Sequence, residues 1–304
     1  MLTILISILF VYVFIILGFV SKMVFKEEMN TKTLTILSVY FFQPFVALWG
    51  FTSAPLKSEH LSVALIYMVV IVLTLVPIYF IGKKIFTDPK ERSIFTIAGF
   101  VGNTGNIGIP LGIALFGQES VIYTTTINLA NVFVVYIIGV YIYSRGKLDI
   151  RASLLNILKI PIIPISLFAI ALNLSDIKLH HQIIEFIKIG AYGGIALQLF
   201  LLGVFLYRNN IKESSKKLIF AVLGQKFLLL PLVGAFILSF SSLDLLVKAI
   251  IVMQLSTPLA VANINLASLY DCKPHTITSL IVISTVLFLP ILFGLIYIIN
   301  TIYL

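Results

Sequence analysis

A short polar stretch rich in glycine interrupts one of the most apolar parts of the sequence, between residues 93 and 117. Its disruptive and polar residues are Gly102, Asn103, Gly105, Asn106, Gly108 and Pro110. Glycine and proline disfavour a helix interior by about 1 and about 3 kcal/mol relative to alanine. We therefore predict a broken helix, in which Asn103 and Asn106 donate hydrogen bonds to a ligand and the glycines and Pro110 shape the site.

A second interruption lies in the run from 249 to 270, where Gln254, Thr257 and Pro258 are followed by Asn263. Two interruptions near the middle of two apolar runs indicate a transport site, because broken membrane helices expose backbone groups that bind substrate. We expect Gln254, Thr257, Pro258 and Asn263 to complete the cavity. The alternative for this run alone is that Pro258 only kinks a packed helix.

Four more polar residues fall inside apolar runs. Lys226 is the one charged residue well within a run, and an intramembrane charge is a candidate for function, although its stem could also extend to the interface. Gln43, Asn128 and Asn131 are candidates for lining the same cavity, with hydrogen bonds between helices as the alternative for each.

The ligand predicted for this site is a small organic anion. A helix that restarts after a break presents free N–H groups and a positive dipole end, which favour a carboxylate. The acidic residues and histidines lie in loops or at the ends of runs, so no buried carboxylate is available to hold a cation. We expect no metal, cofactor or catalytic residue, and leave coupling open between sodium, protons and membrane potential alone.

The elements that position these residues are predicted to be about ten membrane-spanning helices. The chain of 304 residues is 60% hydrophobic and 11% charged, with a mean hydropathy of +1.12, far from a soluble domain. The first run is expected to be a retained span rather than a signal peptide. The ten runs are approximately 2 to 21, 33 to 54, 61 to 82, 93 to 117, 121 to 143, 160 to 176, 189 to 207, 218 to 240, 249 to 270 and 277 to 301.

The basic residues predict the orientation of these spans. Most Lys and Arg residues lie in the loops after the first, third, fifth, seventh and ninth spans, which places those loops in the cytoplasm and both termini outside. We therefore expect a multi-pass protein of the cell membrane, the inner membrane in a bacterium. The formal charge of +9 is explained by this orientation rather than by binding to nucleic acid.

The basic loop 144–159 divides the chain into two halves of five spans, residues 1–146 and 147–304. Because five is odd, two related halves must insert with opposite orientations, which is the inverted repeat of many secondary transporters. The fourth span of each half is the interrupted one. The predicted fold class is thus an all-α integral membrane protein with a five-plus-five inverted repeat.

The segment from Asn103 to Leu111 resembles the fourth-span signature of the auxin efflux carrier family, and Gln254 to Tyr270 resembles the ninth span of that family. The resemblance implies broken fourth and ninth helices that cross at their prolines, as in bile-acid symporters and sodium/proton antiporters. It implies a scaffold of spans 1, 2, 6 and 7 and a core of spans 3 to 5 and 8 to 10. Bacterial members include permeases for malate or malonate. A homodimer through the scaffold helices is one possible assembly.

These observations lead to one main hypothesis, a secondary carrier for a small organic anion that works by an elevator-like motion in the lipid bilayer. A membrane sensor or receptor that binds the same ligand without moving it is the alternative. An intramembrane enzyme ranks third, because the common hydrolase motifs are missing from the sequence.

Overall fold

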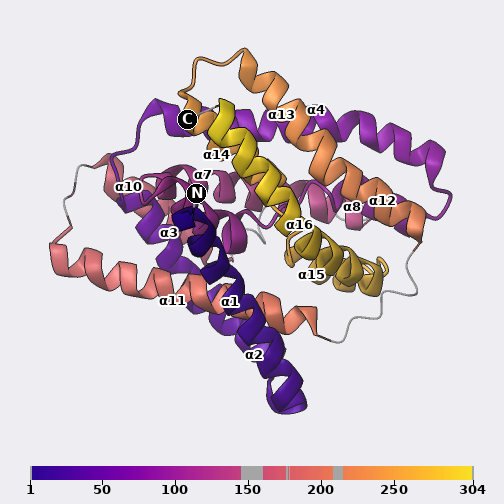
Figure 1. Ribbon diagram of the computed structural model, residues 1–304, viewed down its shortest axis with the longest axis horizontal. Coiled ribbons are helices and arrows are strands. Elements are labelled where there is room, and N and C mark those ends of the chain that lie inside the picture. Colours follow the sequence, from indigo (N-terminus) through magenta and orange to yellow (C-terminus); the bar gives the residue numbers. More distant parts are fainter. Residues whose placement is uncertain (1, 145–159, 176, 178, 208–214, 303–304) are drawn as a thin grey trace. The chain divides into compact units, whose positions relative to one another are not determined.

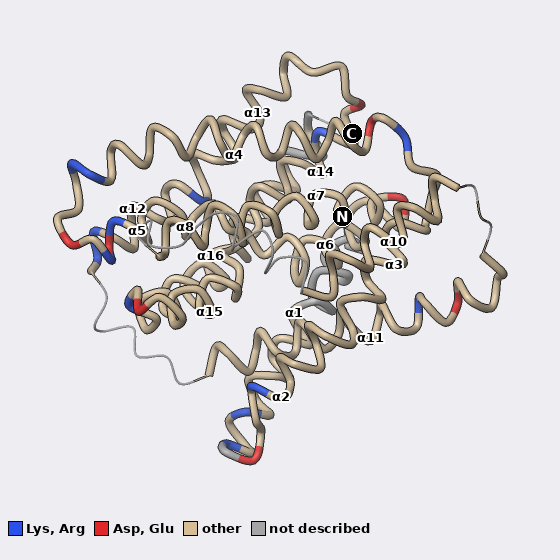
Figure 2. The backbone as a smooth tube through the Cα atoms, turned by 180° about the vertical axis from the view of Figure 1, so that it is seen from behind, with Lys and Arg blue, Asp and Glu red and all other residues tan. Residues whose placement is uncertain are grey.

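The computed structural model describes residues 2–144, 160–175, 177, 179–207 and 215–302, and every regular element in these ranges is a helix (Figure 1). The all-α class predicted from the sequence is confirmed for this part of the chain. Long stretches of the backbone carry no charged residue, and Lys, Arg, Asp and Glu gather mainly toward the ends of helices (Figure 2). This is the distribution that a bilayer requires.

Six of the predicted spans coincide with helical segments that are long and apolar enough to cross a membrane. They are Thr31–Thr52, Ser58–Ile85, Ser120–Tyr143, His181–Leu206, Lys216–Ser239 and Pro274–Tyr297. Four shorter apolar helices of 10–17 residues lie in the other four predicted spans, at Tyr12–Phe25, Thr104–Phe116, Ile162–Leu174 and Leu245–Ser256. The count of ten crossings, the inverted repeat and the sidedness stay predictions.

The seventh predicted span begins earlier than its apolar run. The helix α11 (His181–Leu206) starts at His181 rather than near residue 189, because the side chain of His180 accepts a hydrogen bond from the backbone N–H of Gln182. Its first turns are polar, and Lys188 donates to Glu185 over 3.0 Å. A hydropathy boundary marks where a helix enters apolar surroundings, whereas the cap marks where the helix begins.

The chain forms two compact units, each assembled from three segments of sequence. Unit 1 comprises Met1–Leu61, Gly105–Leu129 and Leu155–Arg208, and unit 2 comprises Ser62–Thr104, Ala130–Leu154 and Asn209–Leu304. The predicted sequence halves and the predicted division into scaffold and core stay predictions.

Unit 1 is built around α11. Its described elements are α1 (Leu2–Phe25), η1 (Lys26–Glu28), α2 (Thr31–Ile36), η2 (Leu37–Phe42), α3 (Gln43–Thr52), α6 (Ile109–Phe116), most of α7 (Ser120–Phe133), α10 (Ile162–Leu174) and α11. The helices α1 and α3 both pack on α11, and α10 packs on α3. The loop between α3 and α4 is fixed by Asn173, whose amide donates to the carbonyls of Phe51 and Ala54 over 2.7 Å each.

Two glycines allow α1 and α11 to approach closely. A Cβ atom built on Gly18 would clash with the carbonyl oxygen of Phe200, and one built on Gly203 would clash with the carbonyl oxygen of Ile15. Small residues bring membrane helices together in this way because lipid offers no hydrophobic force between them. The contact is therefore specified by these glycines rather than by large apolar side chains.

Unit 2 holds the second interrupted span and the first part of the other, up to Thr104. Its described elements are most of α4 (Ser58–Ile85), α5 (Pro89–Ile97), η4 (Val134–Gly139), α8 (Val140–Tyr143), α12 (Lys216–Gly224), η6 (Gln225–Leu229), α13 (Leu230–Ser239), α14 (Leu245–Ser256), α15 (Ala262–Leu269) and α16 (Pro274–Ile302). Within it α5 packs on α8 and α12, α14 on α13, and α15 on α16 and α8.

Replacing Gly203 with alanine is expected to lower the free energy of unfolding by about 1–3 kcal/mol, because the new methyl group would clash with the backbone of α1. The melting temperature of the purified protein should fall accordingly. The matched control is Gly294→Ala on α16, where a Cβ meets nothing within 4 Å. A thermal melt in detergent measures both. Equal melting temperatures for the two variants would contradict the close approach of α1 and α11.

Candidate functional site

Both predicted interruptions are present in unit 2. The helix α5 ends at Ile97, and the chain turns and becomes extended at Gly102 and Asn103 before the π-helical segment η3 (Thr104–Gly108) begins. The helix α14 ends at Ser256, and helix resumes at Ala262. Pro258, predicted as a possible simple kink, therefore lies within a true break.

The two interruptions pair with each other through their backbones. Gly102 and Leu259 form an isolated antiparallel bridge. The N–H of Asn103 donates to the carbonyl of Pro258 over 2.8 Å, and the N–H of Ala260 donates to the carbonyl of Val101 over 2.9 Å. Each break thus satisfies backbone groups that the other exposes, and each such group would cost several kcal/mol if left unpaired in lipid.

The side chain of Asn263 also stabilises this crossing of the two broken segments. Its amide nitrogen lies 3.3 Å from the carbonyl oxygen of Val101 and 3.2 Å from that of Ala260, and its amide oxygen accepts from the hydroxyl of Tyr143 over 2.9 Å. Both ends of this fully buried amide are therefore occupied. We predicted Asn263 as a ligand-binding residue, and the structure places it against the backbone of the crossing.

Asn131 has a similar position. Its amide nitrogen donates to the carbonyl of Gly102 over 2.9 Å, and its amide oxygen accepts from Tyr67 over 3.0 Å. The N–H of Leu259 donates to Ser284 over 3.2 Å. Tyr67, Tyr143 and Ser284 were not among the predicted site residues, because their partners are distant in sequence and no local pattern marks them.

A second set of polar side chains lies buried in unit 2 with atoms that make no hydrogen bond. These atoms are Nδ2 of Asn103, both amide atoms of Gln225, both amide atoms of Gln254, Nζ of Lys226 and Oγ1 of Thr285. Buried polar groups are almost always paired, so such a concentration of unpaired atoms is a candidate ligand-binding site. Asn103, Gln254 and Lys226 were predicted from the sequence. Gln225 and Thr285 were missed, although a glutamine beside an intramembrane lysine was a visible signal.

Lys226 is fully buried and lies against the crossing. A methyl group built on Gly102 would lie 2.7 Å from Nζ of Lys226 and 2.8 Å from Oγ1 of Thr257. Only glycine therefore leaves room for both groups beside this backbone. The alternative that the lysine stem extends to the membrane interface does not fit a side chain with no exposed surface.

An unpaired charge at the membrane centre costs at least about 2.5 kcal/mol. The same lysine lies in η6, one of several π-helical segments, and such segments occur often at functional sites. A π-helical turn interrupts the regular hydrogen bonding of the long α12 to α13 segment and positions Gln225 and Lys226 together. The buried charge and the π-helical turn both lower stability, as is common at a functional site.

The remaining predicted residues lie in unit 1. Pro110 begins α6 and is buried, while Asn106 and Gly108 lie in η3. A Cβ built on Gly105 would lie 2.8 Å from Oδ1 of Asn128, so these two predicted residues are neighbours. Gln43 begins α3 and is half-buried.

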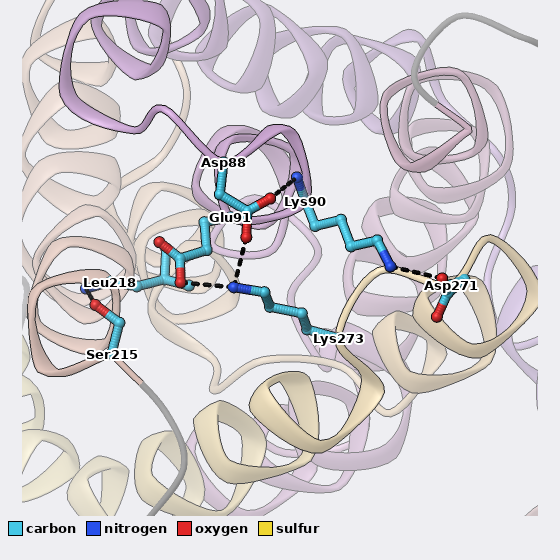
Figure 3. Close-up of polar contacts among 7 residues, drawn as sticks. All are labelled: Asp88, Lys90, Glu91, Ser215, Leu218, Asp271 and Lys273. Atoms are coloured by element: carbon cyan, nitrogen blue, oxygen red, sulfur yellow. Dashed lines mark hydrogen bonds and ion pairs between the residues drawn. The ribbon is translucent and has the colours of Figure 1, made fainter.

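An ion cluster joins the outer ends of the interrupted helices in unit 2 (Figure 3). The ammonium of Lys273, just before α16, lies 2.6 Å from Asp88 and 2.8 Å from Glu91 at the start of α5. Lys90 pairs with Asp271, which follows α15, over 2.5 Å. These contacts tie the start of α5 to the turn that follows α15, so the two helices are held at the cluster as well as at the crossing.

The charges in this cluster shift one another. The hydrogen bond and charge of Lys273 lower the pKa of Asp88, helped by the backbone N–H of Lys90. Burial acts to lower the pKa of Lys273, but its contacts with Asp88 and Glu91 outweigh burial and raise it. Both groups are therefore more firmly charged than they would be alone, which favours the paired state near neutral pH.

Apolar helices of spanning length, two of them broken and paired beside a buried polar cluster, are the design of a helical membrane transporter. The family model described as "Membrane transport protein" matches residues 3–296, and the chain belongs to this family, which confirms the resemblance to auxin efflux carriers. The chain is also similar to the uncharacterized transporter MJ1031 of Methanocaldococcus jannaschii, with 24% identity over 288 residues that cover 91% of this chain and 93% of that protein. The protein is thus a multi-pass membrane transporter.

Removing the ion pairs of Lys273 is expected to cost stability only where Asp88 is ionised. Because the pKa of Asp88 is lowered in the folded state, the stabilisation is present above the ordinary pKa of the carboxyl and is lost as pH falls through the lowered value. Lys273→Met should lower the free energy of unfolding by about 1 kcal/mol at pH 7, since both partners are partly exposed.

Thermal melts in detergent from pH 7 downward measure this difference. Lys84→Met removes the same charge from an exposed position at the end of α4 and is the control. A Lys273→Met deficit that stays constant as the pH falls below the titration range of Asp88 would contradict the assigned pairing.

Proposed function

We propose that this transporter is a secondary carrier of small organic anions, whose carboxylate binds beside the crossing in unit 2. The observation that carries the proposal is the buried ammonium of Lys226, which makes no hydrogen bond and no ion pair among the residues that the structure describes. A buried charge without a partner favours a ligand of opposite sign.

The acidic residues of unit 2 support an anionic rather than a cationic ligand. Within its described residues they are Asp88, Glu91, Asp244 and Asp271. Asp88 and Glu91 belong to the ion cluster, Asp244 precedes α14, and Asp271 pairs with Lys90. No described carboxylate of unit 2 forms an ion pair with Lys226.

Amide groups would supply the rest of the recognition. A carboxylate accepts several hydrogen bonds, and Asn103, Gln225 and Gln254 have buried amide nitrogens without partners. Hydrogen bonds to a charged group contribute about 1.5–3 kcal/mol each. A carboxylate held by one ammonium and two amides is thus well compensated for its loss of water.

Transport would use ten spans arranged as an inverted repeat, with an elevator-like motion of a core against a scaffold. This part of the proposal is supported by the division of the chain into two compact units and by a break in the fourth span of each half. The ion cluster would keep the two broken helices together while they move. The alternative, a sensor that binds the same ligand, is distinguished by flux.

Replacing Asn103 or Gln254 with alanine is expected to reduce flux at least tenfold while leaving thermal stability unchanged or higher. The physical reason is that the amide nitrogen of Asn103 and both amide atoms of Gln254 make no hydrogen bond in the protein, so truncation breaks none of their bonds there. The control is Gln182→Ala, which removes an exposed amide at the start of α11. Uptake of labelled mono- and dicarboxylates into proteoliposomes provides the measurement.

Three outcomes separate the possibilities. Reduced flux in both variants with a normal Gln182→Ala control supports the assigned site. Flux at the wild-type level in Asn103→Ala and Gln254→Ala shows that the site is elsewhere. Saturable anion binding without any flux in wild-type vesicles favours the sensor over the carrier.

A further inference from the structure

Lys226 differs from an ordinary binding residue in having to cross the membrane core in every cycle, with and without substrate. It is fully buried, its ammonium is unpartnered, and the residues beside it are neutral. When a carboxylate is bound, the pair carries no net charge. When the carboxylate has left, a protonated Lys226 would be an unpaired charge buried in the membrane core, which is costly.

We propose that Lys226 is the proton carrier of this transporter: it is protonated when it binds the carboxylate and returns as a neutral amine. This inference rests on the proposed anion transport. On the entry side the amine takes a proton from water and the ammonium binds the anion. On the exit side the carboxylate leaves and the N–H bond breaks, giving the proton to water. One anion and one proton cross per cycle, so a monoanion moves without net charge.

The neighbours of Lys226 suit both protonation states. Gln225 adjoins it in sequence, and the backbone carbonyl of Gln254 accepts from the hydroxyl of Thr257, which lies beside Gly102 with Lys226. The amides of both glutamines are unpartnered. An amide oxygen can accept from an ammonium, and an amide N–H can donate to a neutral amine, so unpartnered amides in this buried cluster are compatible with either state. A carboxylate neighbour would instead hold the lysine permanently charged.

The titratable groups on the surrounding elements do not offer a competing proton site. The segment η6 packs against α12, α13 and α14, and α12 packs against α5 and α16. Apart from Lys226, the ionisable residues of these elements lie in the first turn of each helix, except for Tyr297 near the end of α16. They are Lys216 and Lys217 on α12, Lys248 on α14, Lys90, Glu91 and Arg92 on α5, and His275 on α16. The two buried tyrosines near the crossing, Tyr67 and Tyr143, donate to Asn131 and Asn263.

The decisive test compares net uptake with exchange in proteoliposomes. The probe is whichever of labelled pyruvate, lactate and benzoate the wild type exchanges fastest, with protein-free vesicles as the baseline. Lys226→Arg keeps a positive charge that cannot be given up. We expect it to retain anion exchange, which uses only the loaded state, and to lose net uptake driven by a pH gradient at least tenfold. Lys226→Met should lose both activities.

The matched control is Lys248→Arg on α14, whose ammonium donates to the carbonyl of Ser241, and it should behave as wild type in both assays. If net uptake and exchange fall together in Lys226→Arg, or neither changes, the proton-carrier role is overturned. Because Lys226→Arg could also fail to fold, a second measurement uses the unmodified protein. Uptake of the probe should acidify the vesicle lumen by about one proton per anion without creating a potential.

Uptake that builds a potential and leaves the luminal pH unchanged overturns the inference even if anions are transported. A wild-type protein that exchanges none of the three anions, nor the dicarboxylate malonate, overturns the proposed function itself. The two failures are therefore distinguishable.

Discussion

The pairing of two broken helices through their backbones is the interaction on which the rest of unit 2 depends. A break inside a membrane helix leaves N–H and C=O groups that lipid cannot satisfy. Here the segments around Gly102 and Leu259 satisfy each other, Asn131 donates to the carbonyl of Gly102 that the bridge leaves over, and Asn263 donates a second hydrogen bond to the carbonyl of Val101. The result is irregular backbone that is stable inside an apolar protein.

This arrangement creates room for a polar cluster that would otherwise be too costly. Gly102 has no side chain, so Lys226 and Thr257 can lie against its backbone. The two breaks are joined by backbone hydrogen bonds, whereas the ammonium of Lys226 and the amides of Gln225 and Gln254 are left without partners. The backbone crossing and the unpartnered polar side chains are thus made by different residues, and the crossing positions the side chains.

The sequence predicted the two breaks because glycine, asparagine and proline are locally disruptive and stand out in apolar runs. It did not predict how Asn131 and Asn263 are used, because their partners at Gly102 and Val101 are decided by tertiary contacts. It also missed the ion pairs of Lys273 with Asp88 and Glu91, which join residues far apart in the chain. Of the residues predicted from local pattern, Gly102, Asn103, Thr257 and Pro258 lie in the breaks and the others in helices, and the contacts of each depend on long-range packing.

If substrate binds where Gly102 leaves space beside Lys226, as we propose, a small change at this glycine should weaken binding. A methyl group in Gly102→Ala would displace the flexible end of Lys226, which can move without unfolding the helix, whereas Gly224→Ala places a methyl group with nothing within 4 Å. Equilibrium binding of a labelled anion that the wild type transports should weaken at least tenfold in Gly102→Ala, with its melting temperature retained, and be unchanged in Gly224→Ala. Equal affinity in the two variants would contradict binding of the anion beside Lys226.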